Sequence, residues 1–389
     1  MKAKGIGKVI KRNCLWAIFT VSLLLALCVS AGAESYSDIS VPKEYSGLVE
    51  SLPSEIEKYL PEGLYSSDPS VQGEAVASMS GWEYISSLFS SVISLGVYES
   101  ARLLAAIVAV LTVSAVFSAF RSSISSGALS RAISLSSGCA LIGTVAVVLI
   151  AQIERVVDFF ERLSLLVNGM IPVMGVLYAM GGNVTTAAAS HGTLYLFLSF
   201  CENLCATSAI PVAGLLTAFA FCSALQGTVN LRGLSSALRR CYVFVLILVM
   251  TVLLATLSSQ TLLSSSADSL SSRAAKLVAS NVIPIVGGSV GETLRTVASS
   301  VGYIKNVCGV GMIAFIVILV LPVFVTLLLS RFVFIVSVAV ADILGCESES
   351  RLLSELGGVY GVLIAAVAIS SVSFILALTV FLRCTVAAL

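Results

Sequence analysis

The sequence predicts an all-α polytopic membrane protein with a signal peptide, a short acidic extracytoplasmic region and about six to eight transmembrane helices. Its 389 residues are 58% hydrophobic and 11% charged, with a mean hydropathy of +1.04. Soluble domains carry about 25% charged residues, so this composition excludes one. Runs of about 20 apolar residues recur along most of the chain. The formal net charge of +1 offers no basic surface for nucleic acid.

Residues 1–33 have the three parts of an export signal. Lysines and an arginine between Lys2 and Arg12 form a positive region, and Leu15–Val29 is an apolar run. Ala31-Gly32-Ala33 supplies the small residues that a signal peptidase requires, so Ala31 and Ala33 are the predicted cleavage determinants. The alternative is an uncleaved anchor helix, because the apolar run is only slightly short of a span.

Residues 34–100 form an acidic segment that we expect outside the cytoplasm. This segment contains eleven acidic residues and only two basic ones, Lys43 and Lys58. Segment 60–63 (LPEG) is typical of a helix stop followed by a turn. Residues 81–100 are amphipathic, with apolar side chains suited to a membrane interface: Trp82, Tyr84, Ile85, Leu88 and Phe89. A short lead-in with no partner of its own is the alternative for this region.

Residues 101–389 are predicted to form the membrane domain. Clear spans are 103–120, 132–153, 242–257, 307–329 and 360–382, while 192–225 and 332–344 are apolar but ambiguous in length. Arginines flank three short connections, near residues 121–131, 232–240 and 331–351. By the positive-inside rule all three belong in the cytoplasm, which agrees with an exported N-terminal segment.

An internal repeat of about 110 residues organises the membrane domain. Segment 128–131 (ALSR) recurs as 237–240 (ALRR), and 170–175 (MIPVMG) recurs as 282–287 (VIPIVG), at offsets of 109 and 112 residues. We therefore expect one copy over about 101–210, a second over about 211–321 and a partial third over about 322–389. The arginine connections favour a parallel relation between copies, and an inverted relation stays open.

Each full copy carries an amphipathic stretch followed by an Ile-Pro-centred break. The apolar stripes within 156–167 and 263–277 suggest helices lying along the outer membrane surface. Proline removes a backbone donor and glycine permits a bend, so the candidate pore or hinge residues are Pro172, Gly175, Pro284 and Gly287. Such breaks must be buried in protein or line a polar cavity. Kinked structural helices are the alternative.

Catalytic and cofactor motifs are scarce, so we predict no enzyme and no cofactor or metal. Segment 287–291 (GGSVG) matches G-x-S-x-G, but a nucleophile elbow needs a strand-to-helix turn that a membrane helix does not offer. The ten scattered cysteines suit small buried hydrophobes rather than a zinc site. Candidate intramembrane polar residues are His191, Glu202 and Asp342. A packing histidine, and a short loop at Glu202, are the alternatives.

The order of these parts resembles the stage III sporulation protein AE family of endospore-forming bacteria. The residues that carry the likeness are 57–62 (EKYLPE), 185–189, 265–277 (SSADSLSSRAAKL) and 281–287 (NVIPIVG). The resemblance implies a multi-pass protein of the mother-cell membrane around the forespore. It also implies partners in a secretion-like channel complex: an ATPase, ring-forming membrane proteins and a forespore partner. No catalytic residues carry over from the family.

Two functions follow as expectations. The first is a component or gate of the channel between mother cell and forespore, needed for late forespore development. The second is a stand-alone secondary transporter whose site lies at the two broken segments. The translocated substrate, the stoichiometry and the presence of a pore within this subunit are left open.

Overall fold

The computed structural model describes most of the chain from residue 59 onward. The predicted signal peptide, with Ala31 and Ala33, and most of the acidic segment lie outside the described residues. The described residues are 49, 59–65, 69–79, 81–122, 127–180, 184–226, 232–282 and 287–384.

The described part of the chain is helical and contains no strand, which confirms the all-α class. A short 3₁₀ helix η1 (Glu62–Tyr65) and helix α4 (Pro69–Ser78) come first. They are followed by long helices: α5 (Trp82–Ser122), α6 (Gly127–Met180), α7 (Val184–Gln226), α8 (Arg232–Val282), α9 (Gly287–Ile343) and α10 (Glu347–Cys384).

Six helices in the described ranges are long and apolar enough to cross a membrane, at the lower end of the predicted number. Each of the five clear predicted spans overlaps the candidate span of its own helix. The ambiguous region 192–225 supplies the span Asn203–Ser223 of α7, and 332–344 is the end of the α9 span rather than a separate one. The α5 span, Ser86–Phe117, crosses the predicted boundary at residue 100.

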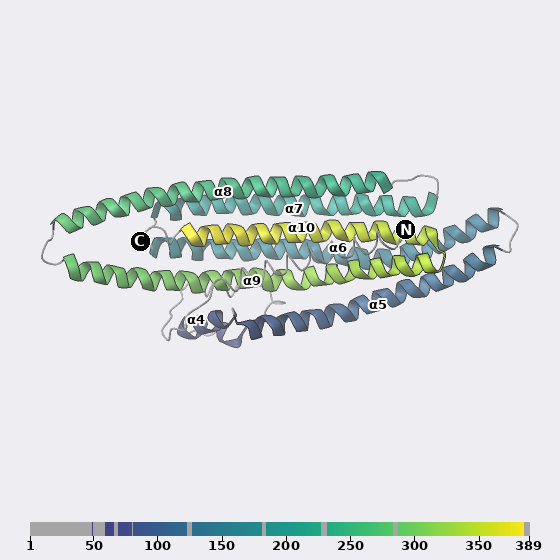
Figure 1. The fold of residues 1–389 in the computed structure, drawn as a ribbon, viewed down its shortest axis with the longest axis horizontal. Helices are drawn as coiled ribbons and strands as arrows, with labels where there is room; N and C mark the ends of the chain where they lie inside the picture. Colours follow the sequence, from purple (N-terminus) through teal and green to yellow (C-terminus); the bar gives the residue numbers. More distant parts are fainter. Residues whose placement is uncertain are drawn as a thin grey trace.

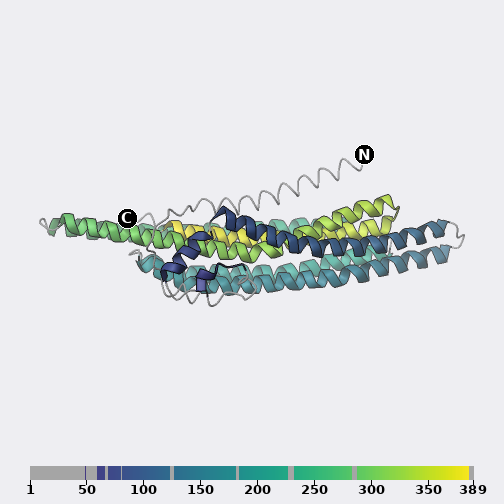
Figure 2. The ribbon, with the colours of Figure 1, turned by 90° about the horizontal axis from the view of Figure 1, so that it is seen from below.

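The long helices lie along one axis and alternate in direction, so the connections α5–α6, α7–α8 and α9–α10 meet at one end (Figure 1). We call this the arginine end, because Arg121, Arg131, Arg232 and Arg351 lie close to these connections, whereas Arg331 lies inside the α9 span. The connections α6–α7 and α8–α9 lie at the opposite end. The α5–α6 pair projects beyond the bundle at the arginine end and the α8–α9 pair at the opposite end (Figures 1 and 2).

Helix α10 lies at the centre of the bundle. It packs against α9, α7, α8 and α6, and its inner side chains are fully buried, among them Leu353, Leu356, Tyr360 and Leu363. In the most apolar window of α9 and of α10, 61% of the segment is buried, against 11% in α8. Helix α8 therefore presents most of its apolar surface outward, while α10 is enclosed by protein.

A glycine turn joins α9 to α10. Gly345 has a φ of 74°, the left-handed conformation that ends helices with little strain only in glycine. The Cys346 N–H donates to the Ala341 carbonyl at 2.9 Å and the Gly345 N–H to the Asp342 carbonyl at 3.3 Å. These are the two bonds of a Schellman motif. The tight turn makes α9 and α10 antiparallel neighbours.

The break predicted at Pro172 is absent, because α6 continues through Pro172 and Gly175 to Met180. Pro172 faces outward, while its neighbours on the inner face are buried: Leu166, Val167, Met170, Val173, Met174 and Leu177. An interior proline costs about 3 kcal/mol. Burial of several large apolar side chains, each contributing about 1.5–3 kcal/mol, offsets that cost and keeps the helix continuous.

The two predicted surface helices are also wrong as separate elements. Residues 156–167 continue the span of α6, and residues 263–277 continue α8. The apolar stripe itself was identified correctly: Val156, Phe159, Phe160, Leu163 and Val167 are buried. They pack into the bundle core, because neighbouring helices rather than a membrane surface cover this face.

The described end of the acidic segment belongs to the fold. Leu64, Val76 and Met79 join the same hydrophobic core as the long helices, and α4 packs against α9. The hydroxyl of Tyr84 donates to the carbonyl of Tyr59 at 2.5 Å, which ties the turn before η1 to the start of α5. Burial raises the pKa of the Tyr84 hydroxyl to about 12.

Candidate functional site

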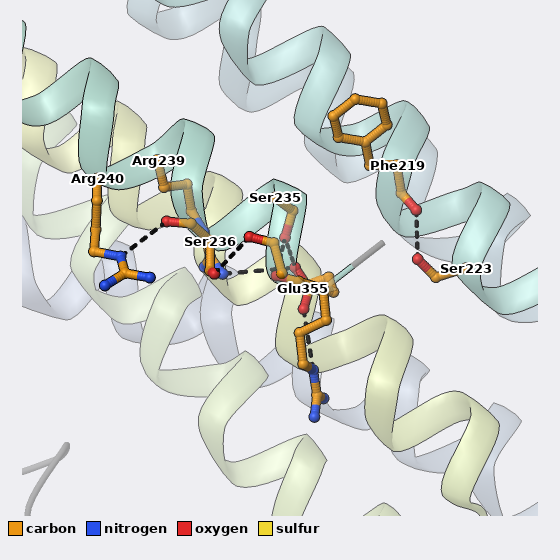
Figure 3. Close-up of polar contacts among 9 residues, drawn as sticks. Phe219, Ser223, Ser235, Ser236, Arg239, Arg240 and Glu355 are labelled. Carbon is orange, nitrogen blue, oxygen red and sulfur yellow. Dashed lines mark hydrogen bonds and ion pairs between the residues drawn. The ribbon is translucent and has the colours of Figure 1, made fainter. Parts of the chain in front are cut away.

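A buried carboxylate on α10 is held by two arginines of α8. Glu355 is 7% exposed, and its oxygens lie 3.2 Å from Nε of Arg232 and 3.6 Å from a guanidinium nitrogen of Arg239. The hydroxyl of the buried Ser235 also donates to Glu355. Figure 3 shows these groups converging between α8 and α10. We call them the Glu355 cluster.

A glycine on α10 makes room for this ion pair. A Cβ built on Gly358 would lie 1.5 Å from the guanidinium nitrogen Nη1 of Arg239. The guanidinium therefore lies directly against the α10 backbone, one turn beyond Glu355. No larger residue fits there unless the arginine moves, so Gly358 and Arg239 are matched in size.

A second buried carboxylate on α10 joins the α5–α6 pair. Glu349 is 5% exposed and accepts hydrogen bonds from Ser114 of α5 at 2.6 Å and Ser137 of α6 at 2.7 Å. Ser348 donates to its other oxygen at 2.6 Å. We call these residues the Glu349 cluster. Charge-assisted hydrogen bonds of this kind are roughly twice as strong as neutral ones.

Further charges lie deeper along the bundle. Glu99 of α5 and Arg155 of α6 form an ion pair at 2.7 Å, with a second hydrogen bond at 3.1 Å. On α9, the half-buried Arg331 places its guanidinium 3.5 Å from where a Cβ of Gly361 would lie. All four residues fall within candidate spans. A charge at the centre of a membrane helix costs about 2.5–3.5 kcal/mol, so retained charges of this kind usually mark function.

These groups connect the central helix to its surroundings rather than form a catalytic centre. The Glu355 cluster joins α10 to α8, and the Glu349 cluster joins α10 to α5 and α6. Removing one partner of a buried pair leaves an uncompensated charge. The arrangement can therefore fix the position of α10, or release it when a partner changes. Among the described residues, no group of three His, Cys, Asp or Glu side chains could hold a metal ion.

The structure separates the predicted pore or hinge residues. Pro172 is exposed and Gly175 is buried, both within α6, and Gly287 is the first residue of α9. Pro284 lies outside the described residues. Figure 1 shows the α8–α9 end, where Gly287 lies, projecting beyond the end of α6. Gly287 thus lies at a different place along the long axis from Pro172 and Gly175.

The predicted intramembrane polar residues have separate positions. His191 and Glu202 both lie within α7, so Glu202 is not in a loop. Asp342 is exposed near the end of α9 and accepts a hydrogen bond from Ser350 of α10 at 2.6 Å. Asp342 therefore stabilises the α9–α10 turn.

Glu349 and Glu355 were not among the predicted site residues, because both lie before the predicted start of the last span. Six residues correspond to about 600° of helix rotation, so the two carboxylates face different neighbours. One signal was available: three acids among serines at the start of α10, Glu347, Glu349 and Glu355, at the end where the positive-inside rule had already placed arginines. That pattern could have predicted ion pairs between α10 and its neighbours.

The fold and these clusters define an all-helical protein of the polytopic membrane class, with carboxylates and guanidinium groups inside the bundle. The sequence profile of the family described as stage III sporulation protein AE matches residues 68–385, and the chain belongs to that family. The predicted resemblance is thereby confirmed.

A curated relative supports the same family. Stage III sporulation protein AE of Bacillus subtilis (strain 168) is 23% identical over 230 residues, which cover 59% of this chain and 58% of the relative. The match thus spans less than two thirds of the relative's length. No solved structure matches the chain. The family assigns the protein to sporulation.

Proposed function

We propose that this chain is the polytopic membrane gate or scaffold of a secretion-like channel between mother cell and forespore. The observation that carries the proposal is the family match over residues 68–385, joined to a bundle of apolar helices with buried charges. The protein acts by assembly rather than catalysis. Its partners are an ATPase, ring-forming membrane proteins and a forespore partner, with membrane lipid around the outer faces.

In this proposal the chain crosses the mother-cell membrane around the forespore. The arginine end faces the cytoplasm and the N-terminal segment lies outside it, as the positive-inside rule requires. The transporter alternative depended on two broken segments, and α6 is continuous through the first. We therefore propose the channel role alone.

Deletion of the gene in the spore-forming host tests this role. We expect engulfment to finish normally, a late forespore reporter to stay silent, and heat-resistant spores to fall sharply. Normal sporulation in the deletion strain would overturn the proposal.

Complementation then connects the role to the site. Glu355→Ala should behave as the deletion does, because it leaves Arg232 and Arg239 without their shared carboxylate. Glu347→Ala is the matched control, since Glu347 lies on the same helix with a side chain that is 81% exposed. If Glu355→Ala accumulates normally and restores spores fully, the Glu355 cluster is not part of the function.

A further inference from the structure

The ion pair Glu99–Arg155 lies at the mid-depth of the bundle. Three residues before Glu99, Gly96 packs on α9, where a Cβ would lie 2.9 Å from Leu329 and 3.7 Å from Val325. These two residues flank the midpoint of the α9 span, Gly311–Ile343, which is the most apolar of the candidate spans. Three residues of helix rise only about 4.5 Å, so Glu99 and its partner lie level with that midpoint.

Helix α10 gives the same depth independently. Arg155 interacts electrostatically with Tyr360, whose ring lies 5.0 Å from that of Phe334 on α9. Tyr360 lies near the middle of the α10 span, Glu347–Thr379. Two neighbouring helices therefore place the ion pair near the centre of any membrane that covers α9 and α10.

At this depth the outer face of α5 and α6 is charged. The side chains of Arg155 and Glu99 are 44% and 41% exposed. Around them, Arg102, Glu154 and Asp158 are exposed as well. Hydrocarbon cannot solvate such side chains, so this face contacts water or protein. The outer face of α8 differs: at this depth it carries large exposed apolar side chains that suit lipid, among them Phe244, Leu248 and Val252.

Two buried hydroxyls favour ordered water inside the bundle at this depth. The Oγ of Ser100, next to Glu99, and the Oη of Tyr360 have no hydrogen-bond partner within the described part of the chain. Both residues are more than nine-tenths buried at the level of the ion pair. Buried hydroxyls are normally satisfied by protein or ordered water.

We propose that the charged face of α5 and α6 lines a water-filled passage at the middle of the membrane. Water in the passage hydrates the exposed side chains of Glu99, Arg102, Glu154, Arg155 and Asp158. Because the lining carries both positive and negative side chains, we expect the passage to admit water and small hydrophilic solutes rather than to select ions of one charge. The inference rests on α5–α10 spanning the membrane and not on the sporulation role.

Cysteine accessibility in membranes tests the passage. Single cysteines at Tyr98, Arg102, Glu154 and Asp158 are introduced into the full chain with its native cysteines replaced by alanine. Each is treated with a membrane-impermeant, cationic methanethiosulfonate reagent. Phe244→Cys and Leu248→Cys are the controls. Arg239 of α8 lies against Gly358 of α10, a few residues before the midpoint of the α10 span. Phe244 and Leu248 come one to three helical turns after Arg239, so they lie near the depth of that midpoint.

We expect the α5 and α6 cysteines to react at least tenfold faster than the α8 controls. Tyr98 is uncharged and its side chain is 73% exposed. Tyr98→Cys therefore leaves the charged residues in place and can be labelled even if the variants that remove a charge do not accumulate. Reaction at Tyr98 and its neighbours as slow as at Phe244 would overturn the passage. So would disulfides between these cysteines in two chains without reagent access, because they indicate a dry contact. A normal or silent forespore reporter in the same strains bears only on the proposed function.

Discussion

At the scale of single residues, the close approach of Arg239 to the α10 backbone decides what α10 tolerates. In an ordinary helix, alanine is about 1 kcal/mol better than glycine. At Gly358 that gain is lost, because the added methyl occupies the position of the guanidinium. The guanidinium that pairs with Glu355 must therefore move before any side chain can occupy position 358.

We expect Gly358→Ala to lower the free energy of unfolding by about 1 kcal/mol or more, because Arg239 must leave the buried Glu355. In an Arg239→Ala background the same substitution should be neutral or stabilising. Thermal unfolding in detergent measures both. Gly143→Ala is the control, since no atom lies within 4 Å of its Cβ. Equal effects of Gly358→Ala in the two backgrounds would contradict the contact.

Tyr84 gives a pH-dependent prediction. Its folded-state pKa of about 12 lies above the ordinary value of about 10. The neutral hydroxyl is therefore favoured by folding, and stability is unaffected below pH 10 and decreases as pH rises towards 12. Tyr84→Phe should remove this alkaline component and loosen η1 from α5, which faster proteolysis near residues 59–81 would reveal. An unchanged alkaline profile in Tyr84→Phe would contradict this assignment.

At the scale of helices, periodicity predicted which residues are buried better than where helices end. The stripe from Val156 to Val167 was identified correctly, because helical spacing fixes a face whatever covers it. The break at Pro172 was wrong, because the packing that supports α6 there comes from distant segments. The Glu355 cluster could not be predicted from local sequence for the same reason, because 120 residues separate Ser235 from Glu355.

The continuity of α6 gives a prediction at this scale. Pro172 is exposed and lacks the N–H that would bond to the carbonyl four residues earlier. Pro172→Ala should therefore raise the midpoint of thermal unfolding and leave spore formation intact. A hinge at Pro172 would require the opposite, with loss of function despite normal protein levels. Spore counts and unfolding in detergent, measured on one strain, separate the two.

At the scale of the molecule, helix length exceeds membrane thickness. The 54 residues of α6 extend about 81 Å, whereas the hydrocarbon core is about 30 Å thick. Much of the bundle therefore lies outside the membrane, where partner proteins can reach it. The offset of the α5–α6 and α8–α9 pairs divides this outer surface between the two sides (Figures 1 and 2).

The orientation of the molecule can be measured with two exposed positions. Glu347 is the first residue of α10, at the arginine end, and Glu62 begins η1, which precedes the end of α5 that lies away from the arginine end. In growing cells that produce the chain in the cell membrane, we expect an impermeant maleimide to label Glu62→Cys in intact protoplasts and Glu347→Cys only after permeabilisation. The reverse pattern would invert the topology, and labelling of both without permeabilisation would contradict six alternating spans.

The central position of α10 has a consequence for how the protein is made. Ribosomes synthesise α10 after the five long helices that surround it, so those helices enter the bilayer with their inner faces still uncovered. Arg232 and Arg239 of α8 then wait for more than a hundred residues of translation before Glu355 emerges. A nonsense mutation before α10 would therefore leave the inner faces of the other helices uncovered and Arg232 and Arg239 without Glu355, a product for membrane proteases to remove.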